Sequence, residues 1–387
     1  MVQSDEHPEL LLQWRRRELN AVRAYHFDGF RPPDHSIRLV LQVLAVTNSR
    51  AAEPSQVMHR RTFLQAGLAP AFSPSGDRIL TVRGAIRPDE LGVCLPHEHL
   101  FSNFGLEPAD PPVYDAPRLL REVLRYVNSV KYLGVGAIVD CTTQYFGRAP
   151  ELLRRISEGT GVHVLTNTGY YGAASGRYVP GHVHEESAGR IAARWVQEFH
   201  GGVGATGIRP GFIKLGVDAG LLKDVDEKLI RAAAIAHRQT GLVIAVHTGD
   251  NAEAARRQMA ILREEGVAGE AWIWVHANNC GDGGALREAA RAGAWLSFDG
   301  IAPETLERHL ALVQMMKSER RLGQVLLSHD GNSFRANGTR PLKPYTALFT
   351  HFLPLLEKSG FTRREVQRLT VENPARAFTV RARVTGI

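Results

Sequence analysis

The sequence predicts an α/β protein folded as a (β/α)8 barrel, the TIM barrel. From about residue 79, short apolar runs alternate with helix-like segments, and there are eight such runs. Each has the length of a strand, and several are rich in Val and Ile. Eight repeats of strand and helix favour a parallel sheet closed on itself. A doubly wound open sheet is the alternative, but it favours a Gly-rich turn after the first strand, and none is present.

The expected strands and helices can be placed by residue range. The eight strands are expected at 92–96, 137–141, 163–168, 211–217, 242–246, 271–275, 294–298 and 325–328. A helix is expected at 118–133, where Leu119, Val123, Val127 and Val130 recur at helical spacing. A second is expected at 225–240, which is rich in Ala. A barrel needs about 250 residues, so the 387-residue chain also holds sequence outside it.

Composition argues against two classes of partner. The net charge of +7 is spread along the chain, whereas a nucleic-acid binder would show a basic stripe. No window approaches the roughly 18 uninterrupted apolar residues of a membrane span. Cys94, Cys141 and Cys280 form no CxxC pair, and we interpret them as small buried hydrophobic residues.

The region before the barrel differs in character. Residues 1–57 are polar and show no alternation of strand and helix. Arg60-Arg61 followed by Phe63-Leu64 and a short apolar run resembles a twin-arginine export signal, and 69–71 offers a cleavage site between small residues. We therefore expect an extension outside the native protein at 1–57, an export signal at 58–77, and the barrel at 78–387. The enzyme would then be exported to the periplasm; if the arginine pair arose by chance, it would be cytoplasmic.

Metal-ligating side chains come at the ends of the predicted strands. The first strand runs into His97-Glu98-His99, and strand alternation points His97 and His99 to one face and Glu98 to the other. An HxH pair alone is a weak signal. Lys214 lies in the fourth strand, however, and His247, His276 and Asp330 follow the fifth, sixth and eighth. Barrel enzymes gather their active sites at these carboxyl-terminal strand ends, so we expect all six side chains to converge.

These motifs resemble one known family. PHEHL at 96–100, FIKL at 212–215, VHT at 246–248, VHA at 275–277 and SHDG at 328–331 are similar to the metal-site motifs of phosphotriesterases and phosphotriesterase-like lactonases, in the amidohydrolase superfamily. The resemblance covers roughly residues 79–378. It implies that His97, His99 and Asp330 hold a buried metal ion, and that His247 and His276 hold a second, more exposed one.

The resemblance also implies a modified lysine. Lys214, carboxylated by CO2, would bridge both ions, because a carbamate has two anionic oxygens and an amine has none. An apolar setting lowers the pKa of a lysine and exposes a nucleophilic amine to CO2. The alternative is an ordinary lysine paired with a nearby acid. The ligand set favours two Zn²⁺ ions, with Mn²⁺, Co²⁺ or Fe²⁺ as alternatives.

The implied reaction is hydrolysis by a hydroxide shared between the two ions, with Asp330 accepting its proton. We favour an ester or lactone as the small-molecule substrate. The alternatives are a phosphotriesterase or phosphodiesterase using the same site, and a metal-binding protein without turnover. The family places an acid where this chain has Asn279, and a His or Arg where it has Gly300. The loss of both groups, which pass the proton outward, argues against fast phosphotriester turnover. The sequence does not decide whether the protein forms a homodimer.

Further residues are candidates for substrate contact. Tyr171 is similar to the tyrosine that the lactonases place over the metal pair, the alternative being an aromatic side chain packed at the rim. Arg335, Arg340 and Lys343 make the loop after Asp330 basic, and Arg177 joins them from the third loop, which favours an anionic or acyl-sugar substrate unless the loop is merely solvated. His182 and His184 do not end a strand, so we interpret them as surface residues. Glu98 and His329 should face away from the metals.

The export signal leads to a first prediction. If Met58 is the true start and the signal is cleaved after Ala71, the exported protein will begin within a few residues of position 72. N-terminal sequencing of protein recovered from the periplasm measures this directly. A mature chain that begins before residue 58 would contradict it.

Overall fold

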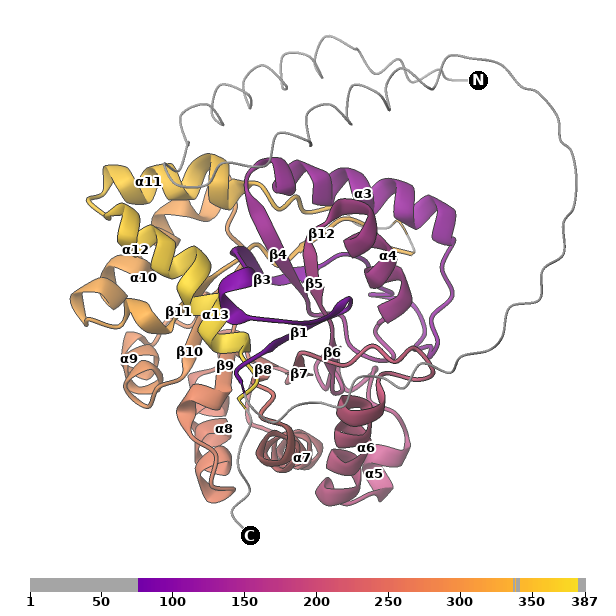
Figure 1. Cartoon of the computed structure of the whole chain (residues 1–387). Helices are drawn as coiled ribbons and strands as arrows, with labels where there is room; N and C mark the ends of the chain where they lie inside the picture. Colours follow the sequence, from indigo (N-terminus) through magenta and orange to yellow (C-terminus); the bar gives the residue numbers. More distant parts are fainter. Residues whose placement is uncertain (1–75, 337, 339–341, 382–387) are drawn as a thin grey trace, which may run out of the picture. The chain divides into compact units, whose positions relative to one another are not determined.

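A computed structural model describes residues 76–336, 338 and 342–381. The expected extension at 1–57 and, apart from residues 76 and 77, the expected export signal lie outside this range, as does Arg340. The described strands form a parallel barrel at the centre, with helices around it (Figure 1). No described helix is long and apolar enough to cross a membrane. The three cysteines are free and buried, as expected.

All eight predicted strands are present, two of them interrupted. Their bounds are β3 (Val93–His99), β4 (Val135–Asp140), β5 (His163–Leu165) continued by β6 (Asn167–Thr168), β7 (Phe212–Gly216), β8 (Ile244–His247), β9 (Trp272–Val275), β10 (Trp295–Phe298), and β11 (Val325–Leu327) continued by β12 (Gly331–Asn332). Neighbours along the chain pair in parallel from β3 to β5 and from β6 to β11.

The barrel closes between its last strand and its first. β12 pairs in parallel with β3, so that Gly331 lies opposite Glu98 and Asn332 opposite His99. Just before β12, the amide of Asp330 donates to the carbonyl of His97 at 3.2 Å. The sheet therefore has the closed form predicted from the sequence rather than the open, doubly wound one.

The helices lie outside the strands and follow them in order. Their bounds are α3 (Ala116–Tyr132), α4 (Pro150–Thr160), α5 (His182–Glu185), α6 (Ala188–Gly201), α7 (Asp224–Thr240), α8 (Ala252–Glu264), α9 (Gly283–Arg291), α10 (Leu306–Ser318), α11 (Leu353–Lys358), α12 (Arg363–Gln367) and α13 (Asn373–Phe378). The two helices expected at 118–133 and 225–240 are α3 and α7. The four apolar residues named for the first are all fully buried.

Two separate apolar clusters distinguish the faces of the strands. The smaller one takes side chains from every side of the barrel, including Cys94, Ala245 and Phe212, and fills its interior. The larger one lies between the strands and the helices. Ile79 of β1 (Ile79–Thr81), which forms an antiparallel hairpin with β2 (Gly84–Ile86), joins the interior cluster together with Phe378. Membership of these clusters shows which face of each strand points inward.

One glycine permits close packing beside the barrel interior. Gly169, just after β6, has φ +116°, and a Cβ placed there would lie 2.2 Å from the carbonyl oxygen of Lys214. A side chain would therefore push against the backbone of β7 at its functional lysine. Gly84 has nearly the same φ, +119°, but no atom lies within 4 Å of a Cβ placed there.

We predict that Gly169→Ala lowers the free energy of unfolding more than Gly84→Ala does. Both substitutions force a rare backbone conformation, which costs about 1–3 kcal/mol. Only Gly169→Ala adds a backbone clash, which costs about 1–3 kcal/mol more. Urea unfolding of the two variants measures the difference. Equal losses would mean that the clash relaxes without cost.

Candidate metal centre

Lys214 and His247 reach the interior by simple alternation along their strands. Lys214 lies two residues after Phe212, and His247 lies two residues after Ala245; both apolar residues belong to the interior cluster. Lys214 is 1% exposed. Its Nζ donates to the carbonyl of Leu215 at 3.2 Å and lies 5.7 Å from the centre of the Tyr171 ring. The amine is thus held inside the barrel.

His97 and His99 reach the interior because β3 is irregular. Cys94 belongs to the interior cluster, so strict alternation would turn Glu98 inward and both histidines outward. The register between β3 and β4 shifts between Leu95 and Glu98. This bulge reverses the faces of the residues that follow, as bulges do. The expected arrangement, with both histidines inward and Glu98 outward, is the one observed.

His276 and Asp330 are turned by left-handed backbone conformations. His276, directly after β9, has φ 62°. Asp330, in the short connection between β11 and β12, has φ 49°. Such values are uncommon for residues with a side chain, and they concentrate at functional sites because neighbouring contacts must hold them. The contacts that flank each residue are therefore part of the site.

The contacts around Asp330 come from the buried carboxylate of Glu98. Its Oε1 accepts hydrogen bonds from the Ser328 hydroxyl at 2.8 Å and from the backbone amide of His329 at 3.1 Å. Its Oε2 accepts one from the amide of Gly331 at 2.6 Å. Glu98 thus binds the chain on both sides of Asp330, and also ties β3 to the last strand.

His329 supports this carboxylate instead of joining the metal site. Its Nε2 accepts a hydrogen bond from the amide of Leu348 at 3.0 Å, so Nδ1 carries the proton. That Nδ1 donates to Glu98 at 2.8 Å. Glu98 and His329 thus contact each other and lie outside both groups of candidate ligands described below.

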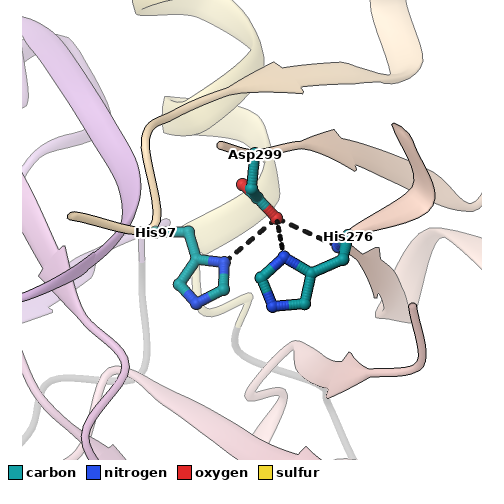
Figure 2. Close-up of side chains that lie close together, drawn as sticks. All are labelled: His97, His276 and Asp299. Carbon is teal, nitrogen blue, oxygen red and sulfur yellow. Dashed lines mark hydrogen bonds and ion pairs between the residues drawn. The ribbon is translucent and has the colours of Figure 1, made fainter. Parts of the chain in front are cut away.

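Asp299 is a site residue that the sequence did not single out. It is fully buried, and its Oδ2 lies 3.0 Å from Nδ1 of His97 and 3.4 Å from Nδ1 of His276 (Figure 2). The same oxygen accepts the backbone amide of His276 at 3.0 Å, and Oδ1 accepts the Ser297 hydroxyl. Asp299 directly follows the seventh strand, at the same end as the other acids and histidines. That position was the one signal available.

Two groups of side chains can each hold a metal ion. The ligand atoms of His97, His99 and Asp330 lie within 4.8 Å of one another, as do those of His97, His276 and Asp299. Asp299 already accepts hydrogen bonds at both oxygens. We therefore interpret it as the carboxylate that orients the two imidazoles through Nδ1, an arrangement common behind metal-binding histidines. Nε2 of His97 and His276 then remains available as a ligand.

The protonation of His99 can be worked out from its neighbours. The Thr142 hydroxyl donates its proton to the carbonyl of Phe101 at 3.0 Å, and its oxygen lies 2.8 Å from Nδ1 of His99. Thr142 must therefore accept from His99, so Nδ1 carries the imidazole proton. Nε2 is left with a lone pair that faces Oδ1 of Asp330 at 3.5 Å. Two electron-rich atoms that face each other at this distance fit a cation between them.

Burial keeps most of the imidazoles neutral, the form that binds metals. Burial lowers the pKa of His99 and of His247, and it lowers the pKa of His276 to about 4. Burial also lowers the pKa of Lys214. His97 differs: burial opposes its charge, but Cys141 and Asp299 together raise its pKa well above the ordinary value. Protons and a metal ion compete for the same imidazole nitrogen, so any metal affinity at His97 falls as the pH falls.

A cavity of about 290 Å³ opens beside these side chains. Asn279 and Gly300, the two positions where this chain departs from the family pattern, both line it, as do Arg308 and Lys343. The structure places the other basic candidates elsewhere. Arg177 pairs with Glu107 at 2.6 Å, and Arg335 donates to Asn332 at 3.1 Å; neither lines the cavity.

Tyr171 packs against both the lysine and a histidine of the site. Its ring meets the His247 ring edge-on, with 5.4 Å between centres, and stacks on Phe146. It lies next to Gly216, where a Cβ would come within 2.6 Å of the tyrosine ring. The two histidines of α5 lie outside this group of side chains. His182, the first residue of α5, contacts the hydroxyl of Tyr170, and His184 is exposed.

Comparisons with known proteins give one consistent answer. The phosphotriesterase family matches residues 77–378. A phosphotriesterase homology protein of Escherichia coli is 29% identical over 75% of this chain and 99% of its own length. An aryldialkylphosphatase of Saccharolobus solfataricus is 26% identical over 78% of this chain and 99% of its own, and an N-acetyltaurine hydrolase of Salmo salar is 25% identical over 80% and 99%. The organophosphorus hydrolase structure from Deinococcus radiodurans superposes with a TM-score of 0.70 at 26% identity, covering 80% of this chain and all of that one.

We predict that Glu98→Gln destabilises the protein and disorders Asp330. If the amide oxygen takes the place of Oε1, the amide NH2 meets the amide of Gly331, and two donors face each other in a buried place. An unsatisfied buried donor costs about 1–3 kcal/mol. Chemical unfolding measures this cost. Glu307→Gln, on the exposed surface of α10, is the matched control and should unfold like the wild type; equal stability of both variants would contradict the assigned role.

Proposed function

The chain belongs to the phosphotriesterase family, and we propose from this that it is a binuclear metal-dependent hydrolase that cleaves a carboxylic ester or a lactone. The observation that carries the metal part of the proposal is the lone pair of His99 Nε2, which faces a carboxylate oxygen of Asp330. In the proposed site, His97, His99 and Asp330 hold one divalent ion. His247 and His276 hold the other.

The bound ions would supply Lewis-acid chemistry, polarising the substrate oxygen and acidifying water. The side chains supply the rest. Oδ1 of Asp330 faces the two imidazoles of β3, while Oδ2 lies 3.5 Å from Nζ of Lys343 on the side of the cavity. We assign Oδ2 as the atom that accepts the proton during hydrolysis. Tyr171, packed against His247, is assigned to orient the substrate oxygen.

Lys214 is proposed to be carboxylated. Its neutral amine would attack CO2, forming an N–C bond as one C=O π bond of CO2 breaks, and the nitrogen would release one proton, leaving an anionic carbamate. Support comes from its burial, which disfavours the ammonium form, and from its position on β7, which pairs with β8, the strand that ends in His247. A carbamate can ligate two cations, whereas an ammonium group repels them.

Phosphotriester hydrolysis is the second candidate. It is favoured by the names of two similar proteins, an aryldialkylphosphatase and an organophosphorus hydrolase. Against it, Asn279 and Gly300 line the cavity at the positions where the family carries groups that pass a proton outward. An ester or lactone makes fewer demands on that relay, so we place it first.

A substrate panel tests the proposal. Protein loaded with Zn²⁺ or Mn²⁺ is assayed with lactones, aryl esters, phosphotriesters and, because of the relatives of that name, N-acetyltaurine. We expect the highest kcat/KM for an ester or lactone. A phosphotriester with the highest value would favour the second candidate. Absence of turnover across the panel would favour a metal-binding protein that does not catalyse.

Matched variants tie the activity to the site. We expect Asp330→Asn to lower kcat by about 100-fold or more, because proton transfer is lost. His247→Asn should also lose activity, whereas His184→Asn, an exposed histidine outside the site, should keep it. A near-native rate for Asp330→Asn would remove that residue from the mechanism.

A further inference from the structure

The cavity beside the proposed metal centre carries two cationic side chains, one from a helix and one from a loop. Arg308 is the third residue of α10, which follows β10, and Lys343 comes from the loop after β12. Both line the cavity together with His247, His276 and Asp330. Positive charge therefore lies in the same cavity as two candidate metal ligands of the site.

The guanidinium of Arg308 is free to bind a ligand. Arg308 is exposed, and its side chain makes no hydrogen bond or ion pair with the residues that the structure describes. Neighbouring arginines differ: Arg287 and Arg291 on α9 both pair with Glu319. A planar guanidinium can bind a carboxylate, phosphate or sulfonate through two parallel hydrogen bonds.

Lys343 is held at the cavity by its backbone. Its amide donates to the carbonyl of Asn332 at 3.1 Å, and its carbonyl accepts from the amide of Asn332 at 2.9 Å. This pair of bonds fixes Lys343 beside the end of β12. Within the described part of the chain, its side chain makes one ion pair, with Asp330 at 3.5 Å, too long for a hydrogen bond. A metal ion bound by Asp330 would compete for that carboxylate and leave the ammonium group in need of another anion.

We propose that Arg308 and Lys343 form an anion subsite that selects substrates with a negatively charged group apart from the scissile bond. This inference rests on the proposed function and narrows its substrate class. The acyl or lactone carbonyl lies toward the histidines, and a carboxylate, phosphate or sulfonate of the same molecule lies toward the two cations. A cavity of about 290 Å³ suits a small molecule, since ligand pockets start at about 300 Å³.

The test compares two esters that differ in one charge. The mono-4-nitrophenyl ester of glutaric acid carries a carboxylate, and 4-nitrophenyl valerate is its neutral counterpart of similar length. We expect metal-loaded wild type to favour the charged ester by about 10-fold in kcat/KM, as hydrogen bonds to a charged group suggest. Added salt should lower this preference, because it screens partly exposed charges.

Variants separate an effect on recognition of the charged group from an effect on catalysis of both esters. Arg308→Gln should lower kcat/KM for the charged ester alone and bring the ratio toward one. Lys343→Met should also bring the ratio toward one, while its loss of the contact with Asp330 changes the rate with both esters. Arg263→Gln removes another exposed arginine, on α8, that does not line the cavity, and should leave the ratio unchanged. Equal losses with both esters in Arg308→Gln, or a wild type that prefers the neutral ester, would overturn the subsite while leaving the hydrolase proposal intact.

A binding measurement tests the anion subsite even if the protein hydrolyses neither ester. Ethanesulfonate is a weak metal ligand and probes the subsite directly. Calorimetry should detect its binding to the wild type and to Arg263→Gln, and binding should weaken by about 10-fold in Arg308→Gln. Equal binding to all three proteins would overturn the proposal. Absence of hydrolysis of either ester together with weakened binding in Arg308→Gln would instead defeat the hydrolase proposal and leave the anion subsite standing.

Discussion

The closure of the barrel at Glu98 is the constraint on which the site depends. A barrel must join its last strand to its first, and here the joint lies next to two candidate ligands on β3 and one just before β12. The carboxylate of Glu98 accepts hydrogen bonds from residues on both sides of Asp330. The same contacts that complete the sheet therefore hold Asp330 in its left-handed conformation. The hydrogen bonds that close the barrel are therefore also the ones that fix the geometry of the site.

Most of the fold could be predicted from periodicity. Eight apolar runs and two helices were placed within a few residues, because burial on both faces and helical spacing leave clear marks in a sequence. What alternation could not predict is which face of each run points inward near its end. His97 and His99 point inward through a bulge, and His276 through a positive φ. These are local departures from regular structure, and they depend on contacts far away in the chain.

The residues behind the candidate ligands were harder to predict than the ligands. Asp299 ends a strand as the others do, but it acts through Nδ1 of two histidines, and no short motif contains those contacts. The basic side chains show the same limit. Arg335 lies in the loop after Asp330 and yet bonds within that loop, whereas Arg308, on a helix outside the predicted loop, lines the cavity. Loop composition indicated positive charge without locating it.

Burial and charge act together in this site. Burial favours neutral imidazoles and a neutral lysine amine, while Asp299 and Asp330 keep negative charge close to them. Such a centre is suited to binding cations, and Arg308 and Lys343 line the cavity beside it. The most direct test of this account is metal content. Protein saturated with Zn²⁺ or Mn²⁺ and dialysed should retain two ions per chain by elemental analysis, and His184→Asn should retain the same two. A wild type that keeps one ion or none would contradict the account.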